Sequence, residues 1–193
     1  MDSMKTSVSI LILLFFSWSG ISCSSIVPPQ KPQRGTRKPL QGEVTILIST
    51  TKGEMIGKIY PEKAPEGAKI FLDLVKKGFY NGKKFIRVVK KPFPFLIQTG
   101  APQNNPHLSA FKPKIIPPGN FHHIRGAIAL AKDPLSGGVT SQFYILLTDA
   151  PYLDGKDTVI GEIIDGMEVA KKIGKEDLVK FIKILKRGEN ERR

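Results

Sequence analysis

The chain has 193 residues, of which 40% are hydrophobic, so it is long and apolar enough for one sizeable folded domain with appendages, which excludes wholesale disorder. Lys and Arg total 30 against 17 Asp and Glu, and the net charge of +13 suits anionic partners such as phospholipid head groups, nucleic acid or acidic proteins. The single Cys excludes an intrachain disulfide and a multi-cysteine zinc site, and the three His lack the spacing of a metal site.

The first 22 residues have the layout of a secretory signal peptide. Lys5 supplies a positive start, residues 8–18 form an almost purely apolar run, and small residues follow. The apolar run is shorter than the roughly 20 residues that a membrane-spanning helix needs. We therefore predict a signal peptide over residues 1–22.

The segment Ser19-Gly20-Ile21-Ser22-Cys23 resembles the lipobox of bacterial lipoproteins, whose Cys becomes the acylated first residue after cleavage. Gly20 departs from the Leu that is usual at its position. An ordinary cleaved signal with an incidental Cys is the alternative, and the lipoprotein is favoured because the only Cys of the chain lies where a lipobox needs it. The resemblance implies lipidation at Cys23, membrane anchoring through acyl chains, and a place in the cell envelope on the periplasmic side of a membrane.

Residues 23–42 follow as a linker rich in Pro and in basic residues. Such a composition cannot build a core and predicts an extended spacer between anchor and domain. The basic residues could add attraction to an anionic membrane surface. A nucleic-acid patch is disfavoured, because no aromatic residues are interleaved for base stacking.

Residues 43–186 carry the periodicity of one mainly β domain, and residues 187–193 form a charged tail. β-Branched and alternating apolar runs predict eight strands, and helical spacing predicts two helices. In chain order, the expected elements are strands at 44–50 and 55–60, a helix at 65–77, strands at 85–89, 95–98, 126–131, 142–147 and 159–163, a helix at 167–173, and a last strand at 179–185. Residues 101–124 are expected to be a long loop. Because most connections are short, these elements predict a closed eight-stranded antiparallel β-barrel capped by two helices.

The stretch 85–100 combines apolar strands with two polar side chains. Arg87 lies inside one apolar run, and Gln98 ends the next. The composition allows two interpretations of equal weight. One is an ordinary hairpin whose Arg87 extends to solvent, and the other is a polar pair set in an apolar pocket.

The domain resembles the cyclophilins, a family of peptidyl-prolyl cis–trans isomerases, through short motifs that occur in order along its length. The matching segments are 51–53, 64–65, 78–82 with 85–88, 95–100, 126–131, 141–145 and 152–156. The resemblance implies a rotamase that assists the folding of proline-containing exported polypeptides, without metal or cofactor, and we expect a monomer.

Carried over by motif, the resemblance assigns the catalytic role to Arg87 with Gln98. It assigns substrate binding to an apolar and polar wall made by Phe95, Leu96, Ala131, Gln142, Tyr144, Tyr152 and Leu153. A cation suits the chemistry, because it can hydrogen-bond the prolyl nitrogen only when the peptide bond is twisted, and such differential stabilisation accelerates a reaction.

Several positions depart from the family pattern. Asp157 replaces the usual His, Lys132 replaces the usual Asn, Ile86 replaces the His before the Arg, and residues 90–94 contain about three extra residues between Arg87 and the pocket. These departures support an alternative function, a cyclophilin-fold module that binds Pro-containing segments of envelope proteins without useful turnover.

Overall fold

The computed structural model describes residues 42–101, 121–134 and 136–186. The predicted signal peptide, the lipidation site Cys23, nearly all of the linker, most of the 101–124 loop and the tail at 187–193 lie outside the described residues. Within the described part, no helix combines the length and the apolar character that crossing a membrane requires.

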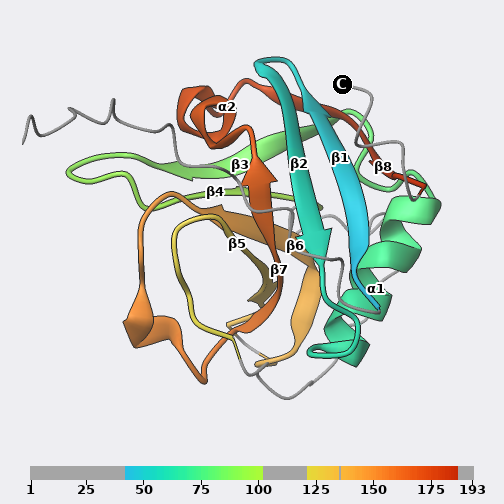
Figure 1. Cartoon of the computed structure of the whole chain (residues 1–193). Helices are drawn as coiled ribbons and strands as arrows, with labels where there is room; N and C mark the ends of the chain where they lie inside the picture. Colours follow the sequence, from blue (N-terminus) through green and yellow to red (C-terminus); the bar gives the residue numbers. More distant parts are fainter. Residues whose placement is uncertain (1–41, 102–120, 135, 187–193) are drawn as a thin grey trace, which may run out of the picture. The chain divides into compact units, whose positions relative to one another are not determined.

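Eight strands, two α-helices and one 3₁₀ turn make up the described part of the domain (Figure 1). The strands are β1 (Val44–Thr50), β2 (Gly53–Ile59), β3 (Lys83–Val89), β4 (Leu96–Thr99), β5 (Ala127–Lys132), β6 (Val139–Leu146), β7 (Thr158–Asp165) and β8 (Leu178–Ile184). The helices are α1 (Pro65–Lys76) and α2 (Met167–Lys172), and the 3₁₀ turn η2 spans Pro151–Leu153.

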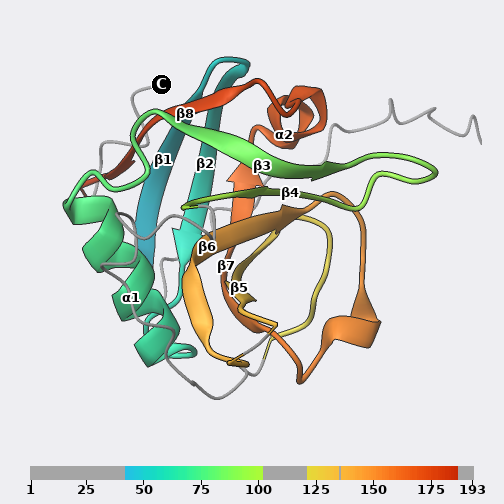
Figure 2. The same cartoon turned by 180° about the vertical axis from the view of Figure 1, so that it is seen from behind.

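The strands close into a barrel in the order β1-β2-β7-β5-β6-β4-β3-β8, with each neighbouring pair antiparallel. Closure removes the free edges that would otherwise expose unpaired backbone groups. The views from front and back show the closed wall, with α1 on one side and the β3–β4 hairpin reaching out on the other (Figures 1 and 2). The predicted mainly β barrel with two helices is confirmed.

Alternate residues of the strands build two separate apolar clusters. The larger cluster draws side chains from all eight strands and therefore fills the barrel interior. The buried strand residues of the smaller cluster come from β4, β5, β6 and β7, and the half-buried Val89 of β3 packs against them. These are the alternate positions of the strands, so the cluster lies on the outer face of that part of the wall. This second cluster is the apolar surface that the candidate site uses.

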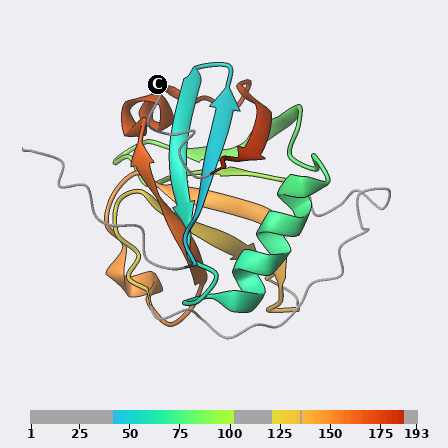
Figure 3. The same cartoon turned by 45° about the vertical axis from the view of Figure 1, so that its right-hand side comes forward.

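The two helices lie on different sides of the barrel (Figure 3). Pro65 starts α1, where its missing N–H costs no hydrogen bond, and the buried face of α1 includes Phe71 and Leu72. The helix packs against β6, β7 and β8, and Phe71 meets Phe143 edge to face with ring centroids 5.2 Å apart. The shorter helix α2 packs against β2.

Most predicted boundaries differ from the structure by one to three residues. The largest shift at a strand start is that of β6, which begins three residues earlier than expected because Val139 pairs with Lys132 across its hairpin. β2 and β3 begin two residues earlier, and Gly53 of β2 pairs with Thr50. The connection between β6 and β7 contains the 3₁₀ helix η2, with Pro151 at its first position.

Candidate active site

A β-bulge in β3 determines which way Arg87 points. Phe85 pairs with Thr99, whereas Arg87 pairs with Gln98, so two residues of β3 advance the register by only one residue of β4. Strict alternation would put Arg87 on the same side as Phe85, which is buried in the barrel interior. The bulge at Ile86 instead turns Arg87 to the outer face, where the structure leaves it exposed.

Arg87 therefore begins a row of residues that runs across four strands. It lies opposite Gln98, Gln98 lies opposite Tyr144, and Tyr144 lies opposite Ala129. Residues directly opposite on neighbouring strands face the same side of the sheet, about 4.5–5.5 Å apart at Cβ. The row places the cation and the amide over the outer apolar cluster, which contains Tyr144 and Ala129.

The extra residues of the β3–β4 connection leave this register intact. Val89 pairs with Leu96, and the backbone N–H of Phe95 donates to the carbonyl of Val89 at 2.9 Å. The carbonyl of Phe95 accepts from the N–H of Leu147 at 2.8 Å. Residues 90–94 thus form a loop beyond the paired strands, and the additional length is absorbed outside the row that holds Arg87.

Two glutamine side chains form a chain of hydrogen bonds beside Arg87. Gln98 Nε2 donates to Gln142 Oε1 at 2.6 Å, and Gln142 Nε2 donates to the carbonyl of Ala101 at 2.6 Å. Gln142 is buried, so these bonds satisfy an amide that would otherwise be costly to bury. Gln142 is thereby fixed, and Gln98 is oriented with its carbonyl oxygen free of this chain.

Gly100 permits the close approach of β4 and β6 that the glutamine pair needs. Its φ is +129°, and a Cβ at this position would lie 2.7 Å from the Cα of Gln142. An L side chain therefore meets both backbone strain and a backbone clash here.

The floor of the site is the outer apolar cluster. Leu96, Tyr144 and Ala131 are buried in it, and Phe95 and Leu153 are half-buried against it. Tyr152, the remaining residue of the predicted wall, is 59% exposed and stacks on Phe95 with ring centroids 6.2 Å apart. The structure thus places the predicted catalytic and substrate-binding residues on one face of the barrel, with Tyr152 at its edge.

Tyr144 and Asp157 form a hydrogen-bonded pair at the wall. The Tyr144 hydroxyl donates to Asp157 Oδ2 at 2.8 Å. Burial raises the pKa of Tyr144 far above its usual range and the Asp157 carboxylate raises it further, while Arg87 acts in the opposite direction. Tyr144 is thus a neutral donor at any physiological pH.

The turn that carries Leu153 is held by Asp154. Asp154 Oδ1 accepts from the backbone N–H of His123 at 2.7 Å, and its two oxygens lie 2.9 Å from His122 Nδ1 and His123 Nδ1. These hydrogen bonds, that of His122 first, hold the pKa of Asp154 well below its usual range. Asp154 therefore positions the pocket wall. Among the described residues, no three His, Cys, Asp or Glu side chains gather as metal ligands would.

Lys132 joins two loops at the far edge of the site. Its ammonium donates to the carbonyl of Lys156, next to Asp157. Two of the positions that depart from the family pattern, Asp157 and Lys132, therefore make local contacts. Asp157 accepts from Tyr144, and Lys132 ties the end of β5 to the turn after Leu153.

One pocket residue was missed by the sequence-based prediction. Phe121 packs against the outer apolar cluster and stacks on Tyr60 with ring centroids 5.3 Å apart. The Lys63 ammonium lies 4.7 Å from the Phe121 ring centroid. Phe121 belongs to the segment 101–124, which lacks any period, so only the presence of an aromatic residue there could have indicated a buried contact.

Known proteins similar to this chain in sequence or in fold are cyclophilin-type isomerases. The sequence profile of the family described as cyclophilin type peptidyl-prolyl cis-trans isomerase/CLD matches residues 45–188. A peptidyl-prolyl cis-trans isomerase-like 1 of Rhizopus delemar is 34% identical over 135 residues, which cover 67% of this chain and 79% of that protein. A peptidyl-prolyl cis-trans isomerase-like 3 of Neurospora crassa is 36% identical over 151 residues, covering 67% and 87%. The crystal structure of a Cryptosporidium parvum cyclophilin type isomerase in the presence of the dipeptide Ala-Pro shares the fold, with a TM-score of 0.61 and 24% identity, covering 74% of this chain and 99% of that chain.

Proposed function

The chain belongs to the cyclophilin type of peptidyl-prolyl cis–trans isomerases, and we propose that Arg87 is its catalytic residue and that the outer apolar cluster binds the substrate proline. The observation that carries the proposal is the bulge-set register that puts Arg87 opposite Gln98 above this cluster. The same register supports an intact site despite the extra residues at 90–94.

Rotation about the prolyl peptide bond is slow because the C–N bond has partial double-bond character, which gives a barrier of ~18–20 kcal/mol. In the twisted state the prolyl nitrogen becomes pyramidal and regains a lone pair. The Arg87 guanidinium donates a hydrogen bond to that lone pair, which the planar ground state does not offer. The contact exists only in the transition state, so it lowers the barrier without tightening ground-state binding.

Arg suits this position because it stays protonated and its planar fork can hold two acceptors. The exposed guanidinium of Arg87 is free to approach a bound peptide, and the substrate itself would exclude water around it. Gln98 lies opposite Arg87 and offers its carbonyl oxygen to orient the guanidinium or a substrate N–H.

The proline ring would lie on Leu96 and Tyr144, with Phe95, Leu153 and Phe121 as walls. Ala131 has a small side chain, so the peptide backbone can pass beside it, and Gln142 holds Gln98 in place. The substrate class follows from this pocket. It is an extended polypeptide containing proline, in keeping with the Ala-Pro dipeptide present with the Cryptosporidium relative.

The natural substrates we propose are exported proteins as they fold. The supporting features are the signal-like residues 1–22, the lipobox resemblance at Cys23 and the basic linker. Uncatalysed prolyl isomerisation takes tens to hundreds of seconds, so a monomeric isomerase tethered to the periplasmic side of a membrane would speed a slow folding step.

Two measurements test the proposal separately. The first is the rate of cis-to-trans conversion of an Ala-Pro tetrapeptide with purified protein, where we expect clear acceleration over the uncatalysed rate. Tight peptide binding with no acceleration would instead support the binding module. The second is membrane fractionation of Cys23→Ser, which should be released into the soluble fraction. Retention of that variant in membranes would exclude Cys23 as the anchor.

A further inference from the structure

The extra residues of the β3–β4 connection build one wall of a second apolar groove beside the proline pocket. The groove has a volume of about 290 Å³ and runs between this hairpin and the segment around η2. Its lining residues are Val89, Lys91, Pro92, Phe93, Pro94, Phe95, Thr148, Asp149 and Tyr152. Figures 1 and 2 show the hairpin tip and η2 on the same side of the barrel.

We propose that this groove is an extended substrate subsite, which binds a large apolar side chain close to the substrate proline. The inference rests on the proposed function of the neighbouring pocket. It adds a sequence preference, because the isomerase would favour proline segments flanked by Phe, Leu or a similar residue.

The groove is continuous with the proline pocket. Val89 and Phe95 line the groove and also pack against the outer apolar cluster. Tyr152 lines the groove, stacks on Phe95 and precedes Leu153. An extended chain advances about 3.3 Å per residue. The rings of Phe95 at the pocket wall and Tyr152 in the groove lie 6.2 Å apart, which corresponds to about two residues of extended chain. We therefore expect the side chain that enters the groove to lie within about two residues of the proline.

The exposed aromatic surface of the groove indicates a binding role. Phe93 is 75% exposed and Tyr152 is 59% exposed, and both face a concavity instead of standing singly on the surface. Ligand sites in proteins typically have volumes of about 300–1,000 Å³, so this groove suits one or two side chains rather than a bulky cofactor. A polypeptide that already occupies the adjoining pocket supplies such side chains.

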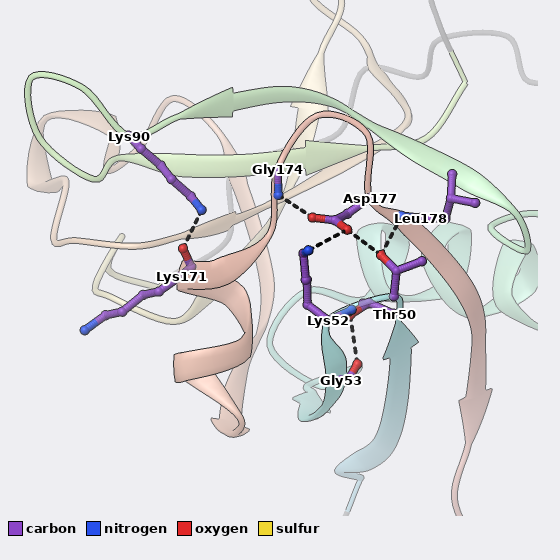
Figure 4. Close-up of polar contacts among 9 residues, drawn as sticks. Thr50, Lys52, Gly53, Lys90, Lys171, Gly174, Asp177 and Leu178 are labelled. Atoms are coloured by element: carbon purple, nitrogen blue, oxygen red, sulfur yellow. Dashed lines mark hydrogen bonds and ion pairs between the residues drawn. The ribbon is translucent and has the colours of Figure 1, made fainter.

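The hairpin that forms the groove wall is fastened at its base. The Lys90 ammonium donates to the carbonyl of Lys171 at the end of α2, where helix carbonyls lack partners (Figure 4). Asp177 in turn holds the segment after α2, since its Oδ2 accepts from the N–H of Gly174 at 2.7 Å and its Oδ1 lies 3.6 Å from Lys52 Nζ. Pro92 and Pro94 restrict the loop itself. A pre-formed wall loses less conformational entropy on binding.

The test uses a peptide series with one proline in an alanine background, and each member carries a single Phe at one of the three positions on either side. The value of kcat/KM is measured for each peptide by NMR exchange with the wild type, Phe93→Ser and Phe181→Ser. Phe181 is an exposed Phe on β8 that does not line the groove, so it is the matched control. In the wild type, Phe within two residues of the proline should raise kcat/KM about tenfold over the all-alanine peptide.

Phe93→Ser should lose most of this gain, retain its rate on the all-alanine peptide, and differ from Phe181→Ser, which should behave as wild type. Lys90→Met, which frees the hairpin base from Lys171, should lose part of the gain. The subsite would be overturned if the wild type accelerates the all-alanine peptide but kcat/KM does not rise with Phe. It would also be overturned if the rise in kcat/KM persists in Phe93→Ser.

A wild type that does not accelerate isomerisation of the all-alanine peptide would overturn the proposed function instead. A membrane-contact role for the hairpin, which would also overturn the subsite, would appear as weaker binding of Phe93→Ser to anionic phospholipid vesicles with unchanged peptide selectivity.

Discussion

Arg87 lies directly opposite Gln98 on the paired strands β3 and β4, although the connection between the strands carries several extra residues. The bulge at Ile86 turns the Arg87 side chain from the barrel interior to the outer face, which holds the apolar cluster. The loop enlarges the site outward and leaves its centre unchanged. The same hairpin can therefore keep the chemistry of the family and add a groove of its own.

The close approach at Gly100 can be tested by substitution. Gly100→Ala should lower the free energy of unfolding by about 1–3 kcal/mol, because it combines strained backbone with a clash against Gln142. It should also reduce kcat/KM, since the clash displaces the glutamine that holds Gln98. Gly82→Ala is the matched control, with a φ of +71° but nothing within 4 Å of the added Cβ. It should cost only about 1 kcal/mol and leave activity unchanged. Equal kcat/KM values for Gly100→Ala and Gly82→Ala would show that the close approach of Gly100 to Gln142 does not affect activity.

The buried Tyr144 should make stability depend on alkaline pH. Its pKa is raised in the folded state, so the neutral hydroxyl stabilises the fold fully below the unfolded value near 10, and this contribution is lost as pH rises above it. Between pH 10 and 11 one such tyrosine should remove about 1 kcal/mol from the free energy of unfolding. Urea unfolding at both pH values measures the change. Tyr144→Phe should show a smaller fall than wild type, with Tyr152→Phe as the control for loss of a hydroxyl. Identical falls in wild type and Tyr144→Phe would contradict this effect of burial.

Asp154 should make the fold sensitive to acid. Its pKa is lowered by hydrogen bonds from His122 and from the backbone and side chain of His123, so its contribution is present above the unfolded value near 3.9 and is lost as pH falls below it. Acid unfolding followed by circular dichroism should be less steep in Asp154→Asn than in wild type. His122→Gln, which keeps the contacts to His123, should give an intermediate curve. An acid-unfolding curve of Asp154→Asn identical to that of the wild type would show that these hydrogen bonds do not make stability depend on pH.

The strands and helices could be predicted because their apolar residues recur with the period of each element. Val44 to Thr50 is rich in β-branched residues and forms the largely buried strand β1, and α1 buries one face from Ala68 to Val75. The motif resemblance then predicted site residues that the structure places together at the outer apolar cluster. What the sequence could not show is the direction of Arg87, because a bulge is a property of two strands in register and leaves no mark on one of them.

Two other features depend on contacts between distant segments. Tyr144 and Asp157 lie 13 positions apart in the chain, and only the fold shows that the hydroxyl of one donates to the carboxylate of the other. Phe121 follows a long segment without periodicity, so nothing local indicated that it would pack on the pocket. In the sequence, residues 90–94 supported a site without useful turnover, whereas in space they form a groove wall outside the paired strands.

The role of Arg87 is the central claim, and one comparison of rates tests it. The value of kcat/KM for cis–trans exchange of an Ala-Pro peptide is measured by NMR for wild type, Arg87→Ala, Arg87→Lys and Arg125→Ala, with peptide affinity measured in parallel. Arg125 is an exposed Arg outside the apolar cluster, and its backbone N–H bond to Asp149 survives the substitution.

We expect Arg87→Ala to lose about 10²–10³-fold in kcat/KM with nearly unchanged affinity, as removal of a donor that acts only in the transition state should do. Arg87→Lys should fall between Arg87→Ala and wild type, and Arg125→Ala should match wild type. Equal kcat/KM values for Arg87→Ala and wild type would contradict the assignment of Arg87 as the catalytic residue.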